Sequence, residues 1–552
     1  MSTTRVFRGG RVFTADAAGT VASAVAVAGG RIVAVGGDRT VAPYLSGAEE
    51  VVELDGRLLL PGFGDAHVHP VMGGLERIRC DLSGANTAAA YVRIIGEYAR
   101  RHPGREWILG GGWAMEAFPG GRPHREVLDA VAGDRPVLLP NRDHHSGWAS
   151  SAALARAGIT RDTPDPADGR IERDADGEPT GLLHEGAADL VRAAAPEDTQ
   201  EDLDAALAEA QRYLHAHGVT SRQDALLTVH ETGPSAHQSY RRADLGGRLT
   251  AKVAGALWWD RPCPRSQVGE QVSRLVAVRA ATAAEGRNYR AGTVKVMQDG
   301  VVETFTAAML EPYLDSRGRA TGNHGISFLE PDLLREVTIA LDSAGFQVHY
   351  HAIGDRAVHD VLDALEGAIA ANGTSARRHH LAHLQVVHPD DVPRFHRLGV
   401  TANLQALWAA HEPQMDELTL PFLGDPRAGW QYPFGDLFRT GAALAMGSDW
   451  PVSSPDPLAA VHVAVTRLAP DAPAGTPALG PEQALPLATA LRAYTAGSAA
   501  VNHLDDVTGS IAVGKAADLV VLDRDPFDGP AGEIAAARVA RTYADGAEVH
   551  RA

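Results

Sequence analysis

Short runs of alternating apolar and polar residues occupy both ends of the chain. Glycine pairs and Asp-Gly interrupt these runs, as in "RVFRGGRVFTAD", "SAVAVAGGRIVAVGG" and "VVELDGRLLL". Alternation with such punctuation predicts short strands joined by hairpins. The C-terminal stretch "GSIAVGKAADLVVLDRDP" has the same pattern. We therefore expect one small composite β-sandwich domain, built from residues 1–57 and 500–552.

The middle of the chain alternates strand-like runs with helical segments such as "DLLREVTIALDSAG". The candidate strands are residues 58–69, 218–225, 249–257, 292–300, 345–355, 378–385, 399–405 and 441–450. Eight strands that alternate with helices predict a parallel (β/α)8 barrel, the TIM barrel. The predicted fold class is therefore α/β, with the barrel within residues 58–499.

A long insertion separates the first two candidate strands. Residues 71–205 contain strand-like "WILGGGW" and "DRPVLLPNRDHHS" and a turn-rich piece, "TRDTPDPADGRIERDADGEPTG". Loops at the carboxyl ends of the strands build the active site in parallel barrels. An insertion after the first strand is therefore expected to shape a substrate pocket.

Composition excludes several classes of protein. The 552 residues carry a formal net charge of −18, which argues against nonspecific binding of nucleic acid, because that needs a basic face. No segment reaches the ~18 consecutive apolar residues of a membrane helix, and the N-terminus lacks a signal-like apolar stretch. The sequence thus predicts a cytoplasmic protein with no nucleic-acid or membrane partner. Its two cysteines, Cys80 and Cys263, cannot form a thiolate metal site, so a metal would need His, Asp, Glu or Lys.

Histidines and one aspartate stand at or just beyond the ends of several candidate strands. His67 and His69 follow "LLLPGFGD" and share one face, because strand side chains repeat every two residues. Two imidazoles so placed can hold a divalent ion, although His-x-His alone also fits two polar residues at a strand end. His383 lies in the sixth candidate strand and Asp449 in the eighth. Because strand ends converge in a barrel, this distribution favours a metal site.

The fourth and fifth candidate strands leave alternatives open. In "GFQVHYHAIGD", His349 and His351 share one face, so either is a candidate ligand. Lys295 alternates with apolar residues in "TVKVMQ", where a lysine would be buried. Burial of an amine is costly unless it is paired or chemically altered. The alternatives are an ion pair with a carboxylate such as Asp299, and a carbamate, formed with carbon dioxide, that bridges two metal ions.

The motifs "PGFGDAHVHP", "VKVMQDG", "VHYHAIGD", "AHLQVVHPDD" and "GSDWPVSSPDPL" together resemble the amidohydrolase superfamily. The resemblance spans nearly the whole chain and is strongest to the amidohydrolase 3 branch, which contains N-substituted formamide deformylases and other metal-dependent hydrolases. It implies a homodimer and a metal-bearing barrel whose fourth-strand lysine is carboxylated in many members. The implied ligands are His67, His69, Lys295, His351, His383 and Asp449. One position departs from the relatives, which often carry Glu where this chain has Ala382.

Resemblance and candidate ligands together predict a metal-dependent hydrolase that cleaves a C–N bond of a small amide or formamide. Imidazoles and carboxylates suit zinc, our default for one or two ions, as well as iron or manganese. A bound ion lowers the pKa of its water toward ~7 and supplies hydroxide at neutral pH. By resemblance, Asp449 is the general base that takes the water proton and the acid that gives it to the leaving amine. The alternatives are a deaminase or an esterase on the same site, and a metal-free barrel used for binding.

Residues outside the ligand set are candidates for binding substrate. His145, in "DHHSGW", matches a Gly-His-Ser-type motif of the family and is a candidate contact for the substrate or its oxyanion. A hydrogen-bonded loop histidine is the alternative. Trp113, in "GGGWAMEAF", fits either a pocket wall or a packed core. Gln405, Trp408 and His411 follow the seventh candidate strand and are candidates for the pocket rim.

Overall fold

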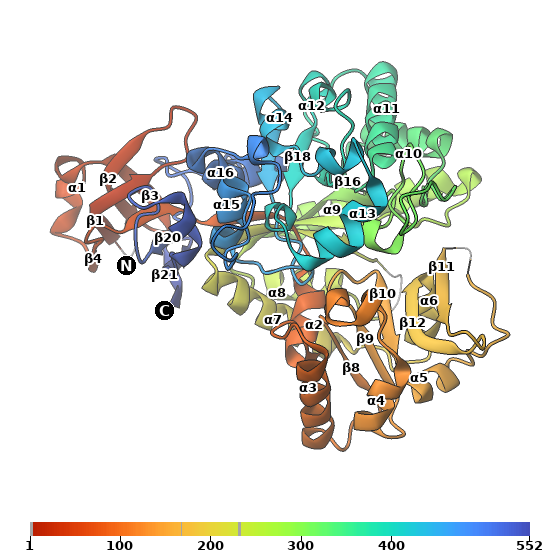
Figure 1. The fold of residues 1–552 in the computed structure, drawn as a ribbon. Helices are drawn as coiled ribbons and strands as arrows, with labels where there is room; N and C mark the ends of the chain where they lie inside the picture. Colours follow the sequence, from red (N-terminus) through yellow and green to blue (C-terminus); the bar gives the residue numbers. More distant parts are fainter. Residues whose placement is uncertain (1–3, 167, 230–232) are drawn as a thin grey trace.

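The computed structural model describes residues 4–166, 168–229 and 233–552 (Figure 1). Over these residues the named strands form three sheets: an eight-stranded parallel barrel, an eight-stranded sheet from both ends of the chain, and a six-stranded sheet from the insertion. The predicted fold class, an α/β chain with a TIM barrel, is therefore confirmed.

The barrel strands follow one another around the barrel in sequence order. They are β6 (Phe63–Val68), β13 (Val219–Leu227), β14 (Lys252–Trp258), β15 (Tyr289–Met297), β16 (Gln347–Ala352), β17 (His380–His383), β18 (Thr401–Leu404) and β19 (Ala443–Met446), and each overlaps one candidate strand. Neighbouring strands pair in parallel. Beyond β19 the chain returns to β6 through backbone hydrogen bonds from Asp449 to His67 (2.7 Å) and from His69 to Trp450 (2.8 Å). These bonds join the first and last strands at the end where the predicted ligands lie.

The first candidate strand is divided in the structure. β5 (Leu58–Pro61) pairs with strands of the terminal sheet, whereas β6 pairs with β13 in the barrel. Gly62 lies between them, and a Cβ there would come within 2.1 Å of Thr220 Oγ1. The sequence showed one run because the chain leaves one sheet and enters another across a single residue, while Leu58, Leu60 and Phe63 stay in one apolar cluster.

Strands from both chain ends build the terminal sheet, in the order β22-β21-β20-β5-β1-β2-β3, with β4 paired to β1. The remaining strands are β1 (Thr4–Phe13), β2 (Val21–Ala28), β3 (Arg31–Gly36), β4 (Glu50–Glu53), β20 (Leu519–Leu522), β21 (Val539–Ala544) and β22 (Ala547–Arg551). β1 pairs first with β4 and then with β5, and its register to β2 shifts between Arg8 and Val12. Such a break lets one strand serve both halves of a sandwich, whose core includes Phe7, Leu519 and Tyr543. The domain limits 1–57, 58–499 and 500–552 stay a prediction.

The insertion folds around its own sheet, in the order β11-β12-β10-β9-β8-β7. Its elements are α2 (Pro70–Ile78), β7 (Cys80–Asp81), α3 (Ala88–Arg101), β8 (Ile108–Gly111), α4 (Arg125–Ala132), β9 (Val137–Pro140), β10 (Ser146–Ala149), α5 (Ser151–Arg156), β11 (Gly169–Arg173), β12 (Pro179–Glu185) and α6 (Gly186–Arg192). Figure 1 shows these elements, in orange and yellow, gathered beside the barrel. The amphipathic helix α3 is capped at its N-terminus by Thr87, whose hydroxyl accepts a hydrogen bond from the backbone of Ala90, and it buries Tyr91 and Ile95.

Helices connect the barrel strands or follow the last of them. The longer ones are α7 (Gln200–Ala216), α8 (Ala236–Leu245), α9 (Val268–Glu285), α10 (Pro331–Ser343), α11 (Asp355–Asn372) and α15 (Pro457–Thr466). α10 is typical: Pro331 occupies its first turn, and Leu334, Val337 and Leu341 form a buried stripe with helical spacing. Across the described ranges, the structure contains no helix with the length and apolar character needed to cross a bilayer.

Candidate metal centre

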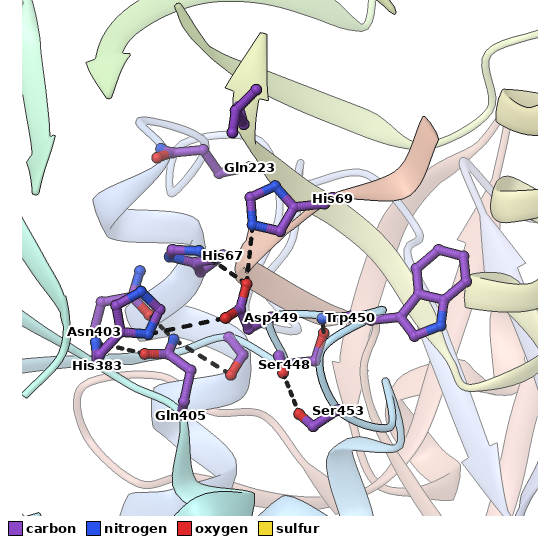
Figure 2. Close-up of polar contacts among 12 residues, drawn as sticks. His67, His69, Gln223, His383, Asn403, Gln405, Ser448, Asp449, Trp450 and Ser453 are labelled. Atoms are coloured by element: carbon purple, nitrogen blue, oxygen red, sulfur yellow. Dashed lines mark hydrogen bonds and ion pairs between the residues drawn. The ribbon is translucent and has the colours of Figure 1, made fainter. Parts of the chain in front are cut away.

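Two buried side chains, His67 and Asp449, and the partly buried His69 converge where β6 ends and β19 leads into its loop (Figure 2). Asp449 Oδ1 lies 3.1 Å from His67 Nε2 and 2.9 Å from His69 Nε2. Each of the three residues offers a donor atom, and all three atoms lie within 4.8 Å of one another. Burial, followed by the charge of Lys295, lowers the pKa of His67 to about 3, so this ring is neutral and can donate a lone pair. The arrangement therefore matches the needs of a divalent cation.

Two further histidines border this group. His383 Nδ1 lies 4.0 Å from Asp449 Oδ2, and its ring centroid is 4.8 Å from that of His67. The ring of His351 lies next, with its centroid 4.5 Å from that of His383. The structure thus brings four of the predicted histidines and Asp449 to one end of the barrel.

Local backbone geometry holds these residues in place. Asp65 accepts hydrogen bonds from the backbone of His67 (3.1 Å) and from the backbone and hydroxyl of Ser448 (3.0 and 2.6 Å), which ties the two loops together. A Cβ on Gly447 would lie 2.5 Å from the backbone nitrogen of His67, so only glycine permits this approach. Asp449 has a left-handed φ of 57°, a conformation that non-glycine residues adopt at a cost and that is concentrated at functional sites.

The two histidines of β16 have different surroundings. His349 uses both ring nitrogens within the barrel: Nδ1 lies 2.6 Å from Gln223 Oε1 and Nε2 lies 2.9 Å from His67 Nδ1. His351 contacts Asp299 Oδ1 through Nδ1 (3.0 Å), which leaves its Nε2 for another partner. This difference favours His351 as the candidate ligand from this strand.

Lys295 is buried on β15, with 3% of its surface exposed. It pairs in register with His349, and burial lowers the pKa of its amine to about 7 although the charge of Asp449 opposes this shift. Asp299, the partner suggested by the sequence, instead accepts hydrogen bonds from His351 and from the backbone of Ala308, Ile353 and Gly354. Among the described residues, no carboxylate oxygen lies within 4.0 Å of the Lys295 amine. Lys295 and Asp299, both within the described ranges, therefore form no ion pair in this structure.

His145 approaches the centre from the insertion. Its Nδ1 lies 2.8 Å from Glu185 Oε1, and its ring centroid is 5.9 Å from that of His351. Burial lowers the pKa of His145, but the charge and the hydrogen bond of Glu185 outweigh this effect and raise it to about 9. The ring is therefore a cation at neutral pH, suited to an oxyanion. The sequence did not single out Glu185, which stands in "GEPTGLLHEGA".

Two other candidate substrate contacts, Trp113 and Gln405, are buried side chains. Trp113 is 0% exposed, donates its indole N–H to the carbonyl of Leu139 (2.8 Å), and packs against Phe118 and Trp148. The structure thus places it in the packed core of the insertion. Gln405 is also buried, and its Oε1 accepts a hydrogen bond from the backbone of His383 (2.6 Å), so it supports a candidate ligand.

A cavity of about 540 Å³ lies beside the centre. Its wall includes residues that follow the candidate ligands closely along the chain: Ile353, Gln385 and Trp450. The insertion contributes Arg77, Asp81, Ser83, Gly84, Arg142 and Asp143, as expected for a segment that shapes a pocket. Trp408, a rim candidate, also lines the cavity and stacks on His383 with ring centroids 5.2 Å apart.

Comparison with known proteins shows similarity over nearly the whole chain. A sequence model described as "Amidohydrolase family" matches residues 50–550. The chain is 30% identical over 553 residues to N-substituted formamide deformylase of Arthrobacter pascens, covering 97% of this chain and 96% of that protein. It is 31% identical over 526 residues to the putative amidohydrolase YtcJ of Bacillus subtilis (strain 168), covering 95% and 94%. Among solved structures, an uncharacterized metal-dependent hydrolase from Pyrococcus horikoshii OT3 matches with a TM-score of 0.73 and 25% identity, covering 96% and 99%.

Proposed function

Because this chain belongs to the amidohydrolase family and is a hydrolase, we propose that it cleaves the C–N bond of a small amide with the help of a bound divalent metal. N-substituted formamides are the first candidate substrates, since a deformylase of this class is similar over nearly the full length of both proteins. The observation that carries the proposal is the convergence of His67, His69 and Asp449 beside a cavity of about 540 Å³. A cavity of this size accommodates a small molecule.

The donor set fits a divalent ion. Neutral imidazole nitrogens and a carboxylate oxygen are ligands that zinc, iron and manganese accept, and zinc is our choice for one or two ions. We assign the ligand roles to His67, His69, Lys295, His351, His383 and Asp449. His351 is chosen over His349 because both nitrogens of His349 are already engaged.

An ion held there would lower the pKa of a water molecule and polarise the amide carbonyl. Asp449 is the residue that would take the water proton and pass it to the leaving nitrogen. Burial raises the pKa of Asp449, but His67 and His69 outweigh that effect and hold it well below its ordinary value, so the group is an ionised carboxylate at neutral pH. Its Oδ2 also faces His383 at 4.0 Å.

His145 supplies positive charge on the insertion side of the centre. Glu185 holds its ring through a 2.8 Å contact, and the threonine hydroxyl of Thr306 donates to the same carboxylate oxygen at 3.2 Å. A fixed cation of this kind stabilises the negative charge that develops on a carbonyl oxygen during amide cleavage. We therefore assign His145 to the binding of the substrate carbonyl.

Lys295 is assigned a carbamate. An amine with a pKa of about 7 is partly neutral at physiological pH, and the neutral amine is the form that attacks carbon dioxide. The attack forms an N–C bond and releases one proton, and the resulting carbamate brings two oxygen donors. Such a group would replace a buried, unpaired cation by a ligand and would allow a second ion.

Assay of a substrate panel tests the proposed reaction. N-formyl, N-acetyl and cyclic amides are incubated with zinc-loaded protein, and the carboxylate and amine products are measured separately. We expect formate and a free amine from at least one N-substituted formamide. Release of ammonia with an intact acyl product would instead indicate a deaminase, and cleavage of esters alone would indicate an esterase.

A further inference from the structure

A row of buried polar side chains lies inside the barrel next to His67. Gln223 of β13, Thr293 of β15, and Gln347 and His349 of β16 are each at most 3% exposed. They form a continuous chain of hydrogen bonds with His67, which we call the interior relay. Burial of so many polar side chains in a barrel core is costly unless each donor and acceptor is hydrogen-bonded, so the direction of each hydrogen bond is constrained by its neighbours.

The far end of the interior relay is fixed by backbone carbonyls. Gln347 Nε2 donates to the carbonyl oxygens of Arg378 (2.8 Å) and Val501 (2.6 Å), and these oxygens can only accept. The amide of Gln347 therefore has one orientation, with Oε1 turned toward Thr293 Oγ1 (2.6 Å) and Gln223 Nε2 (3.3 Å).

The orientation of the Gln347 amide fixes the orientation of the Gln223 amide. Its Nε2 donates to Gln347 Oε1 and to Asn502 Oδ1 (3.0 Å), so its Oε1 is left as an acceptor. The partner of that oxygen is His349 Nδ1, at 2.6 Å, which must therefore carry a hydrogen. Beside a divalent ion a positively charged His349 would be repelled, so the ring is neutral and its Nε2 bears a lone pair.

The last hydrogen bond of the interior relay joins His349 to His67, a candidate metal ligand. His349 Nε2 lies 2.9 Å from His67 Nδ1, which must donate the hydrogen of this bond. A neutral His67 then has its lone pair on Nε2, the atom that lies 3.1 Å from Asp449 Oδ1. A lone pair that faces a carboxylate oxygen is repelled unless a cation lies between them, which is what a metal ion supplies.

We infer that His349 is a positioning residue that, together with Gln223 and Gln347, fixes the tautomer of His67 so that Nε2 is the metal-binding atom. The inference rests on the proposed metal centre and adds to it a role for the second histidine of β16. The two histidines of β16 thus have different roles: His351 is a candidate ligand, and His349 orients the candidate ligand His67.

Zinc affinity of purified variants, measured by competition with a chelator, tests the inference without any need for substrate. His349→Ala and Gln223→Leu each interrupt the interior relay, and we expect zinc to bind about 10–100-fold more weakly, as for other residues that orient metal ligands. His349→Gln should stay close to the wild type, because its amide can donate to Gln223 and accept from His67. This rescue separates the hydrogen-bond role from simple packing.

His380→Gln is the matched control. The ring of His380 is fully buried and packs against His349 at a tilt, with centroids 3.9 Å apart, but its Nδ1 faces Asn403 and not the interior relay. We expect this variant to bind zinc like the wild type. Wild-type zinc affinity in His349→Ala, or an equal loss in His380→Gln, would overturn the inference.

Neutron diffraction of the zinc-loaded wild-type protein covers the case in which a variant fails to fold. The expected deuterons are on Nδ1 of both His67 and His349, and a deuteron on Nε2 of His349 contradicts the inference. Wild-type protein that binds no zinc would overturn both this inference and the proposed function. Zinc binding with the opposite tautomer would overturn the inference alone.

Discussion

Asp449 and His67 contact each other twice, once through the backbone and once through their side chains. The backbone nitrogen of Asp449 donates to the carbonyl of His67 at 2.7 Å, and Asp449 Oδ1 lies 3.1 Å from His67 Nε2. The same residues therefore close the barrel between its first and last strands and offer donor atoms to a metal. Metal binding and the stability of the barrel should be coupled for this reason.

Zinc is expected to raise the thermal midpoint of unfolding. Free zinc at 100 times its dissociation constant stabilises a protein that binds it only when folded by about 2.7 kcal/mol. Differential scanning fluorimetry of metal-free protein, titrated with zinc, measures the shift. His69→Ala should abolish most of it, and an equal shift in this variant would show that zinc binds elsewhere.

Replacement of Asp449 by asparagine should remove both a ligand and the proton carrier. We expect kcat to fall by at least about 10²–10⁴-fold, the usual contribution of a general acid–base. Steady-state kinetics on the best substrate of the panel provide the measurement. Asp456→Asn is the control from the same loop: Asp456 caps α15 through the backbone of Leu458, and asparagine caps a helix equally well. Comparable loss of activity in both variants would count against a specific role for Asp449.

The alkaline limb of the pH–rate profile should report on His145. With a pKa of about 9, the imidazolium is present below that pH and is lost above it, so kcat/KM should fall as the pH rises through about 9. Because the folded-state pKa is raised above the unfolded value of about 6.5, the same pair stabilises the fold fully below pH ~6.5, and this contribution is lost as the pH rises through about 9.

Glu185→Gln removes the charge that raises the pKa of His145, so the alkaline limb should move to lower pH. Glu172→Gln is the matched control, since Glu172 forms another His–carboxylate contact of the insertion, with His184 at 3.2 Å, and lines a different cavity. An unchanged limb in Glu185→Gln, measured across the full pH range, would remove His145 from the proposed mechanism.

The assigned carbamate should be visible by ¹³C NMR of protein equilibrated with ¹³C-bicarbonate. We expect a carbamate resonance that is absent from Lys295→Met. Lys252, the other buried lysine of the barrel wall, should give none, because its amine is paired with Asp518 (2.9 Å) and Asp545 (3.0 Å). Absence of the resonance in active wild-type protein would leave Lys295 as an unmodified amine.

The barrel and most of the candidate ligands could be predicted from the sequence because several strands are short apolar runs with a distinctive polar residue at or just beyond the end. His67, His383 and Asp449 stand at such ends, and parallel strands of a barrel bring their carboxyl ends together. The division between β5 and β6 could not be predicted, because the apolar pattern is continuous where the chain passes from one sheet to the other.

Residues that act on the ligands were harder to find, because their roles depend on strand register. β10 and β12 pair with Ser146 opposite His184, and this register brings the neighbouring residues Glu185 and His145 together. The sequence of neither segment predicts this register. The same holds for Gln223 and His349, which lie 126 positions apart. Gln405 was expected at the pocket rim but lies buried against the backbone of His383, since its side chain points into the barrel wall. Homodimer formation stays a prediction.

Titration of the metal-free protein with zinc, followed by the rate of N-substituted formamide hydrolysis, tests the central claim most directly. If the group around His67, His69 and Asp449 activates water through a bound ion, the rate should rise from near zero and level off at one or two equivalents of zinc per chain. Excess chelator should abolish the rate again. Full activity in protein without stoichiometric metal, insensitive to both zinc and chelator, would contradict the account.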